Sequence, residues 1–257
     1  IKQNKTIKIL FLNKNNINSA CGYYLADAIK KNTTIEILHL SHNRLNESGF
    51  ESFLNILSND NTTLKELDIS YNDLKFNDFK YLSNYLNSNP PIKSLDISGN
   101  KFEPQSANLI GITLKKLTNL EEFKLNECGI TEECATTIFV NLNESNIHNL
   151  ELDSNNLGQM GPIIVLNKIK ASNQLKYISF QGIEMSKIFV DMIIPTILAN
   201  KSIEKLNLKK NEIKADDLKK FVDATSSMKN VKIIFSRDKV PENASEIIAG
   251  NKCIVLQ

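Results

Sequence analysis

The apolar residues of the chain recur in one eleven-position pattern, L-x-x-L-x-L-x-x-N-x-L, with any aliphatic residue or phenylalanine at the L positions. Two clear copies are "LKELDISYNDL" (64–74) and "IKSLDISGNKF" (92–102). Copies start near residues 7, 35, 64, 92, 120, 147, 175 and 203, with a degenerate ninth at 231. Successive starts are 27 to 29 residues apart along the whole chain, so the sequence predicts a single domain over residues 1–257.

Each copy predicts a short strand followed by a helix. Within the pattern, the fourth and sixth positions point inward, and the third, fifth and seventh point outward. The following segment carries apolar residues at helical spacing, such as Phe79, Leu82 and Leu86. Because helices are wider than the strand spacing of about 4.8 Å, a stack of such units curves, with a parallel sheet on its concave face. Residues 236–257 are expected to fold back as a C-terminal cap.

These residues resemble the leucine-rich repeat family. The repeat length and the helical second half, clearest in "SACGYYLADAIKKNTTIEIL" (19–38), are similar to its intracellular, ribonuclease-inhibitor-like branch. The resemblance covers nearly the whole chain. It implies an α/β solenoid, a horseshoe of about nine strand–turn–helix repeats, that acts as a protein-binding scaffold. It does not name the partner, because one fold carries many unrelated functions.

An asparagine recurs at the ninth position of the pattern. Where the chain leaves the strand, backbone groups lose their ladder partners, and a side-chain amide can both donate and accept in their place. The sequence therefore predicts a structural asparagine ladder made of Asn15, Asn43, Asn72, Asn100, Asn155 and Asn211. Cys128 takes this position in the fifth repeat. Ile183 takes it in the seventh, which is either local degeneracy or a softened joint in the solenoid.

A second asparagine series precedes the pattern by three residues. Several members also read as N-glycosylation sequons, but recurrence at one fixed offset favours left-handed residues that close each helix. The series consists of Asn4, Asn32, Asn61, Asn89 and Asn200.

The outward positions, together with the eighth, give a map of the concave surface. Its order is apolar and aromatic first, acidic in the middle and lysine-rich near the end. The middle four repeats place seven carboxylates there against one lysine, Lys124. Like charges on adjacent strands are destabilising, so we interpret the cluster as selected for a basic partner protein; the alternative is accidental clustering of polar residues. The predicted protein-binding residues are Phe11, Ile37, His39, Glu66, Asp68, Tyr71, Asp96, Glu122, Glu151, Asp153 and Tyr177.

Apolar residues are expected to face outward at both ends of the sheet. At the start, Ile9, Phe11 and Ile37 form either an interaction hot spot or a patch covered by residues that precede Ile1. At the other end, the ninth copy places Ile233 and Phe235 at outward positions.

Composition narrows the classes of partner. The net charge is +2 and only two of the 31 basic residues are arginine, which argues against a nucleic-acid partner. No run of 18 apolar residues occurs, so no membrane association is expected. The four cysteines are scattered, which favours free thiols in a reducing compartment and a cytoplasmic location.

No catalytic residue, metal or cofactor is predicted. None of the common nucleotide-binding, hydrolase or metalloprotease motifs occurs, and His39 beside Asp68 favours a surface ion pair over a metal site. One alternative is regulation of a small GTPase, as in relatives resembling the Ran GTPase-activating protein, for which Arg44 is the candidate arginine. Another is that this is the repeat domain of a longer protein or of a secreted bacterial effector, which would place it in host cytoplasm.

Overall fold

Short parallel strands, added in sequence order, form one continuous sheet. The protein is described by a computed structural model that covers residues 1–45, 47–60, 63–171, 174–226, 228 and 230–257. Ten strands lie in this part of the chain: β1 (Ile9–Phe11), β2 (Ile37–His39), β3 (Glu66–Asp68), β4 (Ser94–Asp96), β5 (Glu122–Lys124), β6 (Asn149–Glu151), β7 (Tyr177–Ser179), β8 (Lys205–Asn207), β9 (Lys232–Phe235) and β10 (Ile254–Leu256).

A helix follows almost every strand and returns the chain to the start of the next one. These are α1 (Ser19–Lys30), α2 (Glu47–Asp60), α3 (Phe76–Asn87), α4 (Pro104–Leu114), α5 (Glu132–Ile138), α6 (Gly161–Ala171), α7 (Lys187–Ala199), α8 (Ala215–Thr225) and α9 (Ala244–Ile247), with 3-10 turns η1 (Phe139–Glu144) and η2 (Arg237–Lys239). Polar side chains begin several of the helices: Asn18, Thr131 and Ser186 each accept a hydrogen bond from a first-turn backbone N–H.

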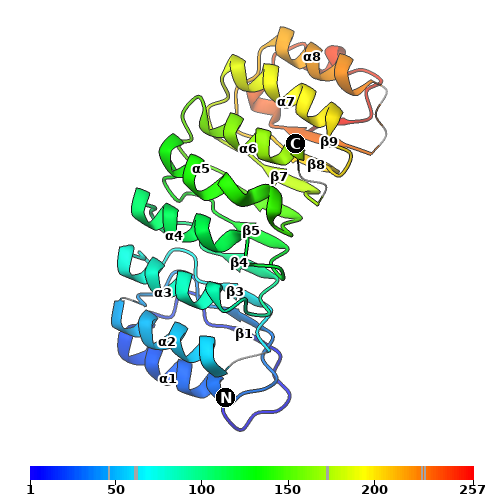
Figure 1. Cartoon of the computed structure of the whole chain (residues 1–257). Coiled ribbons are helices and arrows are strands. Elements are labelled where there is room, and N and C mark those ends of the chain that lie inside the picture. The colour runs from blue at the N-terminus through cyan, green and yellow to red at the C-terminus, as the bar shows by residue number, and fades with distance from the viewer. Residues whose placement is uncertain (46, 61–62, 172–173, 227, 229) are drawn as a thin grey trace.

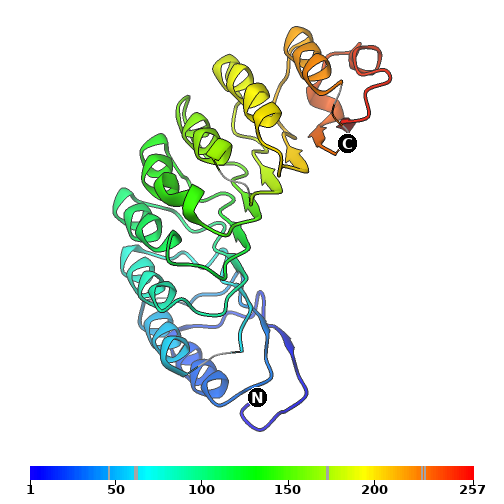
Figure 2. The same cartoon turned by 45° about the vertical axis from the view of Figure 1, so that its right-hand side comes forward.

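The molecule is a curved solenoid. Helices line its outer side and strands its inner side, and the two termini lie at opposite ends (Figures 1 and 2). The predicted fold class, an α/β solenoid of strand–turn–helix repeats with a parallel sheet on the concave face, is confirmed.

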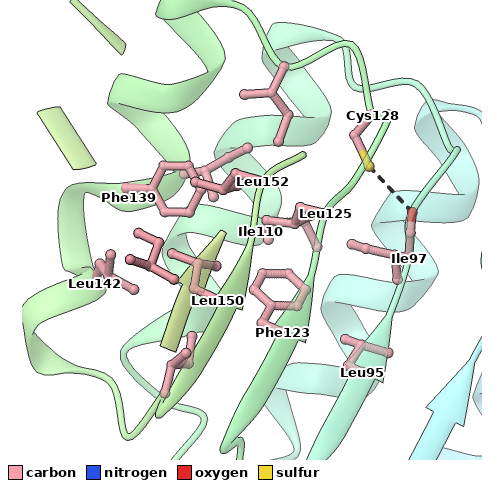
Figure 3. Close-up of a cluster of buried hydrophobic side chains, with 14 of the residues drawn as sticks. Leu95, Ile97, Ile110, Phe123, Leu125, Cys128, Phe139, Leu142, Leu150 and Leu152 are labelled. Carbon is pink, nitrogen blue, oxygen red and sulfur yellow. Dashed lines mark hydrogen bonds between the residues drawn. The ribbon is translucent and has the colours of Figure 1, made fainter. Parts of the chain in front are cut away.

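The core fills the space between the sheet and the helices. Figure 3 shows one section of it, where Phe123 and Leu125 of the fifth repeat pack with Ile110 of α4 and Phe139 of η1. All four side chains are fully buried. They come from inward strand positions and from one face of each helix, so every repeat can bury its apolar side only against its neighbours.

The ninth repeat departs from the predicted register by one residue. Strand β9 pairs with β8 so that Ile233 lies beside Leu206 and Ile234 beside Asn207. A shift of one residue exchanges the two faces of a strand. Ile233 and Phe235 are therefore buried in the core, and the prediction that they face outward is wrong.

The C-terminal segment adds a further strand to the sheet. Strand β10 pairs with β9 in parallel, and Ile254 lies beside Ile233. Ile254 is buried, and Ile247, Ile248 and Leu256 pack against the core from partly buried positions. Strand β10 thus pairs with the edge of β9, and α9 contacts α8, so the C-terminal segment covers the end of the solenoid.

Most left-handed residues lie elsewhere than the sequence predicted. Of the described members of the second asparagine series, Asn89 alone has a positive φ; Asn61 lies outside the described residues. Asn32 and Asn200 are buried, and the side-chain oxygen of each accepts backbone N–H groups two and three residues further on. Left-handed backbone recurs instead at the eighth position of the pattern, at Lys14, His42, Tyr71, Gly99, Glu127, Ser154, Gly182 and Lys210.

Candidate functional site

The strand register gathers the outward side chains into rows across the concave face. We call the side chains at the third, fifth, seventh and eighth positions the inner wall. Pairing of β1 to β8 aligns the third positions Ile9, Ile37, Glu66, Ser94, Glu122, Asn149, Tyr177 and Lys205. It aligns the fifth positions Phe11, His39, Asp68, Asp96, Lys124, Glu151, Ser179 and Asn207. All eleven residues predicted to bind a partner lie on this wall.

The first two strands carry an apolar surface. Ile9 is 50% exposed and Phe11 62% exposed, whereas Ile37 is half-buried. The Phe11 ring contacts the ring of His39 with centroids 4.7 Å apart. Large apolar side chains held on a paired strand lose little further freedom on binding, so they suit a contact with a partner.

His39 joins this apolar surface to the carboxylates of the next strand. Its Nε2 lies 2.6 Å from Glu66 Oε1, and its Nδ1 lies 4.0 Å from Asp68 Oδ2. Among the residues that the structure describes, no group of three or more histidine, cysteine or carboxylate side chains is arranged to hold a metal ion. The shorter of the two contacts is with Glu66, whereas the sequence analysis placed Asp68 beside His39.

Aromatic rings stack at the carboxyl ends of the strands, an arrangement that the sequence analysis missed. His42 and Tyr71 lie face to face, with centroids 4.4 Å apart and planes 3° apart. The Tyr71 ring extends over Gly99, the eighth residue of the next repeat. Burial and a hydrogen bond to Glu127 raise the pKa of Tyr71 to about 12. The sequence did contain a signal for this stacking: the eighth position is aromatic in the third repeat (Tyr71) and is glycine in the fourth (Gly99).

The middle of the wall brings like charges into direct register. Asp68 pairs with Asp96 across β3 and β4. Burial raises the pKa of Asp96, and the charge of Asp68 adds to this effect. Lys124 lies 3.4 Å from Glu122. Burial alone would lower the pKa of Lys124, but the carboxylates of Glu122, Glu151 and Asp96 outweigh it and raise that pKa.

The three wall aspartates also hold the turns that follow the strands. Asp68 Oδ1 accepts from the N–H of Ser70 at 2.9 Å, and Asp96 Oδ1 accepts from the N–H of Ser98 at 2.9 Å. Asp153 Oδ1 accepts from the backbone of the next repeat at 2.9 Å, and burial raises its pKa. These carboxylates are structural as well as charged, so a substitution that removes the accepting oxygen would disturb the turns.

Three wall glutamates, Glu66, Glu122 and Glu151, make their hydrogen bonds with side chains in the described part of the chain. Besides the contact of Glu66 with His39, Glu122 accepts from the Ser94 hydroxyl at 2.6 Å, and Glu151 accepts from the Asn126 amide at 2.8 Å. In the part of the chain that the structure describes, no backbone hydrogen bond depends on these three glutamates. They are the groups through which the charge of the wall can be changed with least damage.

Beyond β7 the wall becomes basic. The Lys205 ammonium lies 4.8 Å from the centroid of the Tyr177 ring, and burial raises the pKa of that tyrosine. Within the described residues, no ion pair involves the wall lysines Lys205, Lys209, Lys210 and Lys232. Tyr177 therefore marks the border between the acidic and basic parts.

The ninth-position asparagines bond from repeat to repeat. Asn100 Oδ1 accepts from the N–H groups of Asn72 (3.0 Å) and Leu74 (3.2 Å), and its Nδ2 donates to three backbone carbonyls. Asn43, Asn155 and Asn211 make equivalent contacts. Asn72 donates in the same way, but its buried Oδ1 has no partner among the described residues. Asn15, at the exposed end of the stack, donates to Asn13.

Two residues replace asparagine in this series. The Cys128 thiol donates to the carbonyl of Ile97 at 3.5 Å (Figure 3). Burial raises the pKa of Cys128 to about 12, which disfavours the reactive thiolate. Ile183 is buried and its side chain can neither donate nor accept.

Arg44, the candidate arginine for the alternative of GTPase regulation, is exposed directly after the ladder asparagine Asn43.

Comparisons with known proteins agree with this architecture. A family model described as "Leucine Rich repeat" matches residues 31–54, 60–75, 88–110 and 199–222. A similar solved structure is the leucine-rich repeat-containing protein LegL7 from Legionella pneumophila, with 15% sequence identity and a TM-score of 0.66. The match covers 99% of this chain and 84% of that chain. No curated protein matches the sequence. No helix in the described residues is long and apolar enough to cross a membrane.

Proposed function

Because the chain belongs to the leucine-rich repeat family, we propose that it is a non-enzymatic scaffold whose acidic inner wall binds a basic surface of a partner protein. The family supports the general role of protein binding. The charge of the wall supports the nature of the partner.

The observation that carries this proposal is the concentration of carboxylates on the wall. In the middle four repeats the inner wall carries seven carboxylates and one lysine, although the whole chain has a net charge of +2. Asp68 and Asp96 lie directly opposite each other, an arrangement that lowers stability. A basic partner would relieve this repulsion, and the field of the wall would speed its approach.

The proposal is tested with two variants of equal charge change. The wall variant carries Glu66→Lys, Glu122→Lys and Glu151→Lys, and the control variant carries Glu103→Lys, Glu133→Lys and Glu242→Lys at exposed positions off the wall. Both replace three negative charges with three positive ones. Far-UV circular dichroism and thermal unfolding establish that both are folded.

Each protein is immobilised and exposed to a lysate at low salt. We expect wild type and the control variant to retain the same basic proteins, released by salt, and the wall variant to lose them. If all three retain the same proteins, the inner wall is not the binding surface and the proposal is wrong.

A further inference from the structure

The inner wall changes character in a fixed order along the solenoid. The apolar zone consists of Ile9, Phe11 and Ile37 on β1 and β2. The acidic zone consists of Glu66, Asp68, Asp96, Glu122, Glu127, Glu151 and Asp153, around β3 to β6. The lysine zone consists of Lys205, Lys209, Lys210 and Lys232, around β8 and β9. A partner that contacts the whole wall meets these three surfaces in sequence.

The apolar zone is a preformed anchor site. Ile9 and Phe11 alternate on β1 with the partly buried core residue Leu10, so both side chains point into the hollow. Phe11 is fixed on one side by the His39 ring and exposes 62% of its surface. Exposed aromatic and aliphatic side chains on a rigid element are the usual centre of a binding hot spot.

The carboxylates begin directly beside this anchor. In the third-position row Ile37 is followed by Glu66, and in the fifth-position row His39 is followed by Asp68. Adjacent strands are about 4.8 Å apart, so a cationic side chain about 5 to 10 Å from an apolar one reaches both surfaces together. The wall therefore fits an apolar residue followed closely by basic ones.

The lysine zone fixes the orientation of such a partner. Within the described residues, its lysines form no ion pair, although the charges of Lys209 and Lys210 act on Asp153 and lower the pKa of that carboxyl against the effect of its burial. Lys205 and Lys232 are exposed at the third-position row of β8 and β9. A basic segment placed here would be repelled, whereas an acidic one would be attracted.

We propose that the inner wall binds one segment of its partner in a single orientation, with an apolar side chain on the apolar zone, basic residues on the acidic zone and acidic residues on the lysine zone. This inference rests on the proposed function and adds the order of chemical groups in the partner. Strands β1 to β8 span about 34 Å at about 4.8 Å each, a length that about ten extended residues cover.

Four fluorescent peptides of one composition test the order. Two carry the blocks phenylalanine–isoleucine, four lysines and four glutamates in that order, written in either chain direction. Two permuted peptides, again in either direction, place the glutamates between the apolar and lysine blocks. We expect one ordered peptide to bind wild type at least tenfold more tightly than both permuted peptides.

Two single substitutions test the anchor. Phe11→Ala is expected to weaken the binding of the ordered peptide about tenfold. Tyr24→Ala, which removes a ring that is 71% exposed on α1, is expected to leave the affinity unchanged. Both sites are exposed, so neither change threatens the fold.

The results separate this inference from the proposed function. If ordered and permuted peptides bind wild type equally, or Phe11→Ala has no effect, the ordered docking is wrong, while loss of basic proteins by the wall variant still supports the scaffold. If no peptide binds wild type, the ordered docking is likewise wrong, and the capture experiment alone decides the proposed function.

Discussion

The ring of Tyr71 lies directly over Gly99, so that a Cβ built on Gly99 would come within 2.2 Å of the ring. Gly99 also has a φ of +69°, a backbone conformation that glycine adopts without strain. The relationship gives Gly99 two requirements, one from its own backbone and one from the preceding repeat.

A matched pair of substitutions separates these two requirements. Gly129 has a φ of +61° but nothing within 4 Å of the position that its Cβ would take. Gly129→Ala is expected to lower the free energy of unfolding by about 1 to 2 kcal/mol, because alanine is strained at this positive φ. Gly99→Ala is expected to cost about 1 to 3 kcal/mol more, because the Tyr71 ring must move. Denaturant unfolding measures both, and equal losses would show that the ring does not hold this position.

The pH dependence of stability tests the like-charge pair on the wall. Because the folded pKa of Asp96 is raised, ionising Asp96 is harder in the folded chain than in the unfolded chain. Its contribution to stability is therefore present below the unfolded pKa and is lost as the pH rises through the folded pKa. Asp96→Asn keeps an oxygen that can accept the Ser98 N–H, and it is expected to be up to about 1 kcal/mol more stable than wild type at pH 7.

This gain is expected to shrink as the pH falls from the raised folded pKa of Asp96 toward about 4, the ordinary value for an aspartate, because the folded carboxyl becomes neutral in that window. Asp73→Asn, at a largely exposed carboxylate, is the control and should change stability by less than about 0.5 kcal/mol. Unfolding at a series of pH values measures the differences. A constant gain at every pH would show that charge is not its cause.

The asparagine ladder predicts unequal effects of one substitution at two sites. Asn100→Ala would leave the N–H groups of Asn72 and Leu74 without their acceptor in the buried turn. We expect a loss of about 2 to 4 kcal/mol in the free energy of unfolding. Asn15→Ala, at the exposed end, is expected to cost less than about 0.5 kcal/mol. Similar losses at both sites would contradict a role for stacking between repeats.

Thiol labelling tests whether Cys128 is structural. Cys21 is exposed, whereas Cys128, Cys134 and Cys253 are buried. With an aromatic disulfide reagent at pH 8, we expect one thiol to react at once and three to react only when the chain unfolds. Cys21→Ser should remove the fast phase. A fast phase that survives this change and disappears with Cys128→Ser would show that Cys128 is reactive.

The fold could be predicted because the same pattern of apolar residues recurs in each repeat. Leu67 lies between Glu66 and Asp68 on β3, and the same alternation recurs in register on the neighbouring strands, so errors in one copy are corrected by the others. The prediction for the ninth copy was wrong because this alternation is missing there. Ile233, Ile234 and Phe235 are all apolar, so no alternation indicates which of them faces the core.

The inner wall could be predicted as a set of residues but not as a set of contacts. Alternation places Glu122 and Glu151 on the concave face, yet it does not show that Asp96 and Asp153 also hold the backbone of the turns. The stacking of Tyr71 depends on the left-handed backbone at the eighth position, which the pattern of apolar residues does not reveal. Such contacts depend on backbone conformation, whereas the rows depend only on periodicity.

The salt dependence of partner binding tests the acidic wall most directly. The affinity of a captured basic partner is measured for wild type, the wall variant and the control variant at about 50 mM and about 200 mM salt, where screening differs strongly. We expect affinity for wild type and the control variant to fall steeply with salt, and affinity for the wall variant to be weak and nearly constant. Equal affinity and equal salt dependence for all three proteins would contradict the claim that the wall carboxylates bind the partner.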